Sequence, residues 1–153
     1  MQLRRYRAED LPILAHLFGE TVRRVNSRDY APPQVQAWAA GEADLLTRDS
    51  WFQRLYTLVA EADGRIVGYG NVDDTGYLDH LFVRWDCQGQ GIATALCDAL
   101  EAHCRELGVD AVTVHASKTA LPFFLRRGYR VEREQQMPVR GQVLTNYAMN
   151  KTL

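Results

Sequence analysis

The chain has 153 residues, which is long enough for one domain with a proper hydrophobic core and too short for two domains of ordinary size. Hydrophobic residues make up 46% and charged residues 24% of it, as in soluble globular proteins, and no apolar run approaches the roughly 20 residues that span a bilayer. The formal net charge of −1 argues against the broad basic face that nucleic-acid binding normally requires, and no secretory signal precedes the first charged segment, so we expect a cytoplasmic protein.

The first part of the chain predicts one strand followed by two helices. Residues 2–7 alternate as in a short strand. Asp10 is expected to cap the next helix, because apolar residues recur at helical spacing through residues 11–24. After a proline pair, a second short helix is expected over residues 34–40, with Gly41 as its stop.

The middle of the chain predicts an antiparallel meander. Residues 56–62 and 66–72 are rich in β-branched and aromatic side chains, and Asp63-Gly64 between them is a strong hairpin signal. A polar turn then leads into a third apolar run, residues 77–83.

The last part of the chain alternates between helical and strand patterns. Residues 92–107 have apolar side chains at helical spacing and are followed by a glycine, which predicts a long helix. A strand over residues 111–116, a helix near residues 119–126, and strands over about 129–137 and 142–149 complete a mixed α/β pattern without internal repeats.

A glycine-rich segment lies between the third apolar run and the long helix. Gly89 and Gly91 have no Cβ atoms, so successive backbone N–H groups there can approach an anion closely. The first N–H groups of the following helix have no partner inside the helix and lie at the positive end of its dipole. The segment therefore predicts a phosphate-binding loop, with a simple tight turn as the alternative.

Three phosphate-binding motifs compete for this segment. The P-loop motif requires Lys and then Ser or Thr after its last glycine, but Ile92-Ala93 follow Gly91. The dinucleotide-binding motif requires a third glycine where the chain has Thr94, which makes that interpretation weak. The third pattern, Gln/Arg-x-x-Gly-x-Gly/Ala, is satisfied by Gln88, Gly91 and Ala93.

With this loop the chain resembles the GNAT superfamily of acyl-CoA-dependent N-acyltransferases. The order of elements agrees over nearly the whole chain, and residues 116–124 followed by Gly128-Tyr129 are similar to the superfamily's fourth helix and next strand. Residues 140–147 resemble the branch of small bacterial acetyltransferases called YafP-like.

The resemblance implies an α/β fold with a central, mostly antiparallel mixed sheet of six to seven strands and about four flanking helices. It implies one acyl-CoA N-acyltransferase domain over residues 1–153, with acetyl-CoA as co-substrate and no metal. Because the superfamily often pairs through its C-terminal strands, a homodimer is left open.

The resemblance also implies a path for acetyl-CoA. In the superfamily the fourth strand diverges from the fifth, which frees backbone groups for the pantetheine arm, and here residues 114–116 would form the opposite edge. The residues then expected to contact acetyl-CoA are Leu81, Phe82, Val83, Gln88, Gly89, Gln90, Gly91, Ile92, Ala93, Thr94, Ser117 and Phe124.

The strand over residues 77–83 should also carry the general base. Strict alternation places Tyr77, Asp79, Leu81 and Val83 on one face and Leu78, His80 and Phe82 on the other. The superfamily's base position holds Tyr77, so Asp79 is the nearest carboxylate and the expected base, with a salt-bridged or turn-capping aspartate as an equal alternative. His80 is expected to face away from Tyr77, Asp79, Leu81 and Val83 and to have a structural role.

The chain departs from the superfamily at the usual general acid, a tyrosine, because Phe124 stands at that position. The departing thiolate would then take its proton from water or from another residue such as Tyr147, or would leave without being protonated. This departure leaves open an acyl-CoA-binding sensor with little turnover. A nucleotide-binding protein that uses the same loop is a third hypothesis.

The acyl acceptor is expected to be a primary amine of a small molecule or peptide. In the superfamily the region after the first helix borders the acceptor pocket, so Tyr30 and Trp38 are candidate walls, although packing in the core is the commoner role of such aromatic residues. The sequence does not identify the acceptor.

Overall fold

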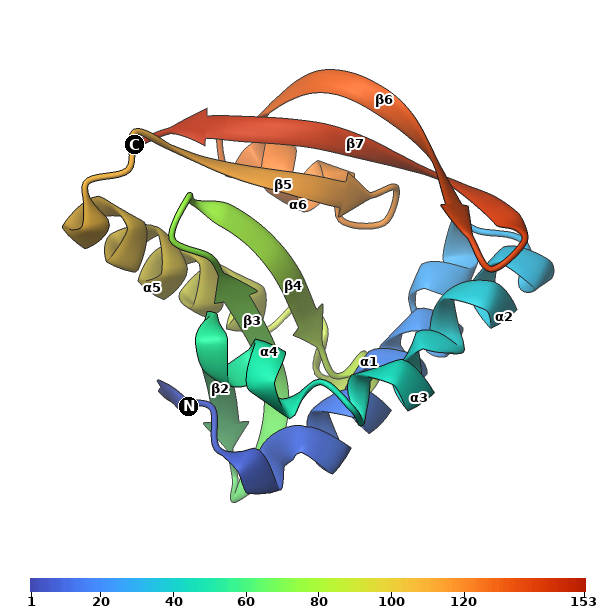
Figure 1. Cartoon of the computed structure of the whole chain (residues 1–153), viewed down its shortest axis with the longest axis horizontal. Coiled ribbons are helices and arrows are strands. Elements are labelled where there is room, and N and C mark those ends of the chain that lie inside the picture. Colours follow the sequence, from blue (N-terminus) through green and yellow to red (C-terminus); the bar gives the residue numbers. More distant parts are fainter.

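A computed structural model describes all residues from 1 to 153 and contains one seven-stranded sheet (Figure 1). The strands are β1 (Gln2–Arg5), β2 (Tyr56–Ala62), β3 (Arg65–Val72), β4 (Tyr77–Val83), β5 (Ala111–Ser117), β6 (Arg130–Val139) and β7 (Gln142–Thr152). Their order in the sheet is β1-β2-β3-β4-β5-β7-β6, and only the β4–β5 pair is parallel. The predicted mixed, mostly antiparallel sheet is confirmed.

Six α-helices accompany the sheet. They are α1 (Leu11–Arg24), α2 (Pro32–Ala39), α3 (Gly41–Leu45), α4 (Asp49–Arg54), α5 (Ile92–Leu107) and α6 (Leu121–Arg126). Three short 3-10 turns lie at residues 8–10, 26–28 and 85–87. No helix combines the length and apolar character that crossing a membrane demands.

Two local expectations in the N-terminal region are wrong. Gly41 does not end a helix: the chain keeps right-handed helical geometry at Ala40, and Gly41 starts α3. Asp10 does not cap α1 with its side chain. Its carboxylate accepts hydrogen bonds from the Arg7 N–H (2.8 Å) and from the Arg4 guanidinium, and so closes the turn before the helix.

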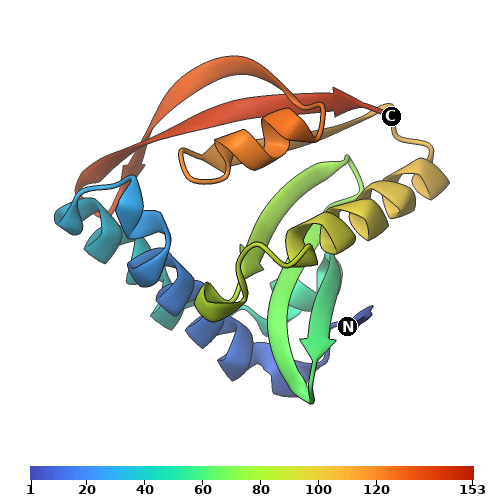
Figure 2. The same cartoon turned by 180° about the vertical axis from the view of Figure 1, so that it is seen from behind.

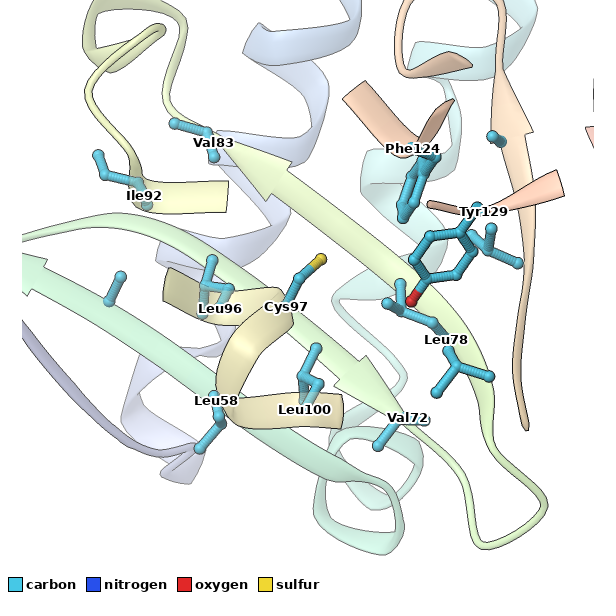
Figure 3. Close-up of a cluster of buried hydrophobic side chains, with 14 of the residues drawn as sticks. Leu58, Val72, Leu78, Val83, Ile92, Leu96, Cys97, Leu100, Phe124 and Tyr129 are labelled. Atoms are coloured by element: carbon cyan, nitrogen blue, oxygen red, sulfur yellow. The ribbon is translucent and has the colours of Figure 1, made fainter. Parts of the chain in front are cut away.

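The sheet separates two hydrophobic cores. One lies beneath α5 and α6, which Figure 2 brings to the front of the sheet, and Figure 3 shows Leu96 and Leu100 of α5 close to Leu58 and Val72. The other is formed by α1 to α4 against the opposite face and is rich in aromatic rings. β2, β3 and β4 therefore contribute to both cores, and β5 contributes to the first core alone.

β4 departs from regular pairing on both of its edges. Toward β5 it pairs only through Tyr77 with Thr113 and Leu78 with Val114, and beyond these residues the two strands separate (Figure 1). Toward β3 the register shifts, so that two residues of β4 face Asn71 alone. This is a β-bulge, and it reverses the alternation of side chains at that point.

The bulge corrects the predicted faces of β4. Leu78 lies in the same core as Val83, beneath α5, whereas Phe82 packs against the other core and His80 stacks on Phe18 of that core. The expectation that Leu78 shares a face with His80 and Phe82 is therefore wrong, because strict alternation assumes a strand without an inserted residue.

A buried carboxylate ties α5 to the C-terminal strands. Glu101 is 2% exposed, and its Oε2 accepts hydrogen bonds from Arg127 Nε (2.9 Å) and the Tyr129 hydroxyl (2.8 Å). Its Oε1 accepts one from Lys151 Nζ (2.9 Å). Burial alone would raise the pKa of Glu101, but these hydrogen bonds lower it below the usual 4.5, so the group stays ionised in the fold.

Candidate active site

A cavity of about 750 Å³ lies where β4 and β5 separate. Its walls come from both sides of the sheet: the loop before α5, α5 itself and α6 on one side, and α1, α2 and the β6–β7 hairpin on the other. The gap in the sheet therefore connects the predicted phosphate loop to the predicted acceptor region in one continuous space.

The backbone of β4 faces this cavity at Leu81 and Val83. The Arg84 N–H donates to the Val67 carbonyl (2.8 Å), and in an antiparallel ladder every second residue bonds to the partner strand. Phe82 therefore directs its backbone groups toward Tyr69 of β3, while Leu81 and Val83 direct theirs toward β5. Pantetheine would find unpaired groups at Leu81 and Val83 rather than at all three predicted residues.

One of these groups is already in use. The Val83 carbonyl accepts hydrogen bonds from Thr21 Oγ1 (3.0 Å) and Gln88 Nε2 (2.8 Å). Gln88 thus fixes the phosphate loop to the end of β4. Gln90, by contrast, is exposed and lies outside the residues that line the cavity.

The glycine-rich loop has the geometry of an anion cradle. Gly89 (φ +72°) and Gly91 (φ +81°) are left-handed, and no atom lies within 4 Å of where a Cβ would stand at either residue. The first N–H group that donates a hydrogen bond within the helix is that of Ala95, whose acceptor is the Gly91 carbonyl. The N–H groups of Ile92, Ala93 and Thr94 therefore have no partner inside α5. The residues present fit the pyrophosphate of coenzyme A.

Ser117 and Phe124 also line the cavity. Ser117 Oγ accepts a hydrogen bond from the Ala120 N–H (3.0 Å) and so holds the turn into α6. Phe124 is 2% exposed, and its ring packs edge-on against Phe123 and Tyr129. No proton donor replaces the missing hydroxyl at position 124 itself.

Tyr77 and Asp79 line the cavity at the point where β4 and β5 separate: Tyr77 still pairs with Thr113, and Asp79 follows the last paired residue. Asp79 lies at the bulge and keeps contact with solvent. The protein atoms around its carboxyl and the charge of Asp73 raise its pKa above 3.8, while Arg48 and His115 oppose the rise. Burial and the Asp79 charge raise the pKa of Tyr77 to about 12, so its hydroxyl stays protonated at neutral pH. Asp79 is the better base of the two.

His80 lies on the opposite face of β4 from Leu81 and Val83, as expected, but it also lines the cavity, because the cavity is open to both faces of the sheet. Its ring stacks on Phe18 (5.8 Å between centroids) and lies edge-on to Trp51 (4.9 Å). Burial and the nearby Arg48 lower its pKa to about 4, so it is neutral at pH 7. Its Nδ1 is 2.9 Å from the hydroxyl of the buried Tyr69.

Tyr30 and Trp38 both line the cavity, and their rings meet edge-on with centroids 5.4 Å apart. The Tyr30 hydroxyl donates to the Thr145 carbonyl (2.6 Å) and accepts from the Lys118 N–H (2.9 Å). Tyr30 is therefore a wall of the cavity and also a tie between β7 and the loop that follows β5.

Two other placements differ from the sequence-based site. Tyr147 is not among the residues that line the cavity, and its hydroxyl lies 3.5 Å from Glu134. Asn26, which the sequence did not single out, lines the cavity and is 6% exposed, and its side-chain amide makes no hydrogen bond within the protein. A single asparagine in a loop gives no sequence signal for such a role.

Comparison with known proteins shows close relatives over the whole length. Residues 26–151 match the family model described as an acetyltransferase (GNAT) domain. The uncharacterized N-acetyltransferase YafP of Escherichia coli is 32% identical over 152 residues, which cover 97% of this chain and 94% of YafP.

Solved structures agree with this match. The crystal structure of a GCN5-related N-acetyltransferase from Rhodopseudomonas palustris has a TM-score of 0.96 at 32% identity and covers 99% of this chain and 95% of its own. PaiA N-acetyltransferase of Thermoplasma acidophilum, solved with coenzyme A, has a TM-score of 0.73 at 15% identity, with 99% and 98% covered, and shares the fold.

Proposed function

Because the chain belongs to the GNAT family of acetyltransferases, we propose that it transfers the acetyl group of acetyl-CoA to the primary amine of a small molecule or peptide by direct attack on the thioester. One observation carries this proposal. The unpaired edge of β4 runs from the glycine-rich loop, which suits a pyrophosphate, to Asp79, which suits a base.

The residues that would hold acetyl-CoA follow from this arrangement. The N–H groups at the start of α5 would bind the pyrophosphate, with Gly89 and Gly91 allowing its close approach. Free backbone groups of Leu81 and the Val83 N–H would bind the pantetheine arm, as an added strand would be bound. The ligand supplies an acetyl group activated as a thioester.

The chain's own groups would manage the protons. The amine nitrogen bonds to the acetyl carbon as the C–S bond breaks, and Asp79 takes the proton that the nitrogen loses, directly or through a water molecule. The departing thiolate takes its proton from water, because Phe124 has none to give and Tyr147 lies outside the cavity lining. The electron pair of the broken C–S bond thus stays on the thiolate sulfur, and the proton of the amine goes to Asp79.

A second candidate function is a sensor that binds acyl-CoA with little turnover. The buried Phe124 at the usual position of the acid favours it, because a general acid typically contributes roughly 10²- to 10⁴-fold to a rate.

Calorimetric titration of acetyl-CoA, CoA, ATP and NAD, followed by a thiol-release assay with a panel of primary amines, tests both functions. Acetyl-CoA binding with amine-dependent thiol release supports the acetyltransferase. Binding without release across the panel supports the sensor, and selective binding of ATP or NAD contradicts both.

A further inference from the structure

The cavity carries very few charges. Among the residues that line it, Asp79 is the only Asp or Glu and Arg126 the only Lys or Arg, and His80 and His115 are the two histidines. Arg126 belongs to α6, on the side of the sheet where the phosphate loop lies (Figure 2). On the acceptor side the lining therefore has one carboxylate and no lysine or arginine, although Arg48 acts on Asp79 and His80 from outside the lining and Lys118 Nζ lies 5.4 Å from the centroid of the Tyr30 ring. One carboxylate is enough to pair with one ammonium group.

The acceptor side is otherwise apolar. Six of its lining residues belong to the core formed by α1 to α4 or pack against it, and they are Phe18, Tyr30, Trp38, Phe82, Val139 and Leu144. Met137 and Pro138 of β6 extend the same wall. Binding of a hydrocarbon group to this surface is favourable, because it removes apolar area from water. Binding of a polar group that finds no hydrogen-bond partner there is unfavourable.

This wall is fixed before any ligand binds. Besides the bond from Tyr30 to Thr145, Gln34 Nε2 donates to the Val143 carbonyl (2.8 Å) and the Arg140 guanidinium donates to the Ala37 carbonyl (3.1 Å). These bonds tie the end of the β6–β7 hairpin to α2 and to the loop before it. A preformed wall lowers the cost of ordering on binding and discriminates between acceptor shapes.

We propose that the acceptor is a primary monoamine carried on an apolar body, such as an arylalkyl or branched alkyl group. The inference rests on the proposed function, because it assumes that the amine reaches the thioester beside Asp79. The ammonium end then lies at the only carboxylate and the hydrocarbon body covers the aromatic wall. A polyamine would leave further ammonium groups without a carboxylate partner.

The test compares amines that differ only in their bodies. Thiol release is measured with 2-phenylethylamine and with ethylamine, its counterpart without the ring, and then with ethanolamine, glutamate and spermidine. Burying a phenyl group is expected to raise kcat/KM by about 10- to 150-fold over ethylamine. Calorimetric binding of 2-phenylethylamine to the CoA-saturated protein gives a readout that does not depend on turnover.

Two variants test whether the preference for 2-phenylethylamine depends on the apolar wall. Trp38→Ala is expected to lower the ratio of kcat/KM for 2-phenylethylamine to kcat/KM for ethylamine by about tenfold. Met137→Glu adds a carboxylate to the half-buried wall, so it should raise the activity with spermidine relative to that with 2-phenylethylamine. Val143→Ala, at an exposed residue of the same hairpin, serves as the control and should change neither ratio.

The outcomes separate the inference from its premise. If no amine increases thiol release, the proposed acetyltransferase function fails. If transfer occurs but ethanolamine, glutamate or spermidine matches 2-phenylethylamine in kcat/KM, the proposed acceptor class is overturned while the acetyltransferase function stands. A preference for 2-phenylethylamine that Trp38→Ala reduces by about tenfold supports the proposed acceptor class.

Discussion

Glycine occupies a left-handed position at both ends of α5, and these two glycines form a matched pair for testing the phosphate cradle. Gly91 precedes the helix with φ +81°, and Gly108 follows it with φ +79°. No atom lies within 4 Å of where a Cβ would stand at either residue. Only Gly91 lines the cavity.

Replacing either glycine with Glu should cost similar stability. A non-glycine residue in the left-handed region loses about 1–2 kcal/mol, and each kcal/mol lowers the melting temperature of a chain of this size by about 2–4 °C. We therefore expect Gly91→Glu and Gly108→Glu to melt about 2–8 °C below the parent protein, with little difference between them.

The two variants should differ in acetyl-CoA binding. Two unit charges 4 Å apart interact by about 1 kcal/mol in bulk water and by more near a protein surface. A carboxylate at position 91 facing the two charges of a pyrophosphate should then weaken binding by at least about 2 kcal/mol, or roughly 30-fold in Kd. Gly108→Glu should bind with the parent's Kd.

Gly91→Gln separates the effect of charge from that of bulk, because the glutamine side chain has the shape of the glutamate side chain but no charge. Calorimetric titration at two salt concentrations should show that the gap between Gly91→Glu and Gly91→Gln narrows as salt rises. Equal Kd values for Gly91→Glu and Gly108→Glu would refute the assignment of the pyrophosphate to this loop.

Three further predictions concern the base, the unpaired amide and the buried carboxylate. Asp79→Asn should lower kcat by about 10²- to 10⁴-fold at pH 7, whereas Asp74→Asn, at an exposed residue, should not change kcat. The rate of the parent protein should fall on acidification as Asp79 becomes protonated. Equal kcat values for Asp79→Asn and the parent would exclude Asp79 as the base. Asn26→Ala should raise the Kd for acetyl-CoA by about 2- to 13-fold without lowering the melting temperature, because the amide has no partner in the protein; an unchanged Kd would exclude that contact. Glu101→Gln should lower the free energy of unfolding by about 3 kcal/mol at pH 7, since it removes the charge that pairs with Arg127 and Lys151. Because the pKa of Glu101 is lowered in the fold, this stabilisation is present above about pH 4.5 and disappears as pH falls through the folded pKa, so denaturant curves of parent and variant should converge in acid.

Most of the elements could be predicted because each had a local cause. The long helix α5 combined an apolar stripe with a glycine at each end, and Asp63-Gly64 marked the β2–β3 hairpin. The short helices α3 and α4 had no such pattern, and Gly41 looked like a stop because glycine is common there.

The candidate site was predicted less completely, because it depends on contacts between distant segments. The bulge opposite Asn71 follows from how β3 and β4 pair, and it places Leu78 on the face of Val83 rather than on the face of His80 and Phe82. The use of the Val83 carbonyl by Gln88 and the position of Tyr147 outside the cavity lining likewise depend on tertiary packing. The glycines of the loop were predictable because their role lies in their own backbone.

The short pairing between β4 and β5 has a consequence for the lifetime of the protein. Two residue pairs join the two parts of the sheet, so an acetyl-CoA molecule bound along β4 would supply contacts that the chain itself lacks. A ligand at 100 times its Kd stabilises a fold by about 2.7 kcal/mol, and the population that proteases can attack shrinks accordingly. The abundance of this protein would then rise and fall with the concentration of acetyl-CoA. When acetyl-CoA is scarce, the reaction would slow and the protein would also be degraded faster.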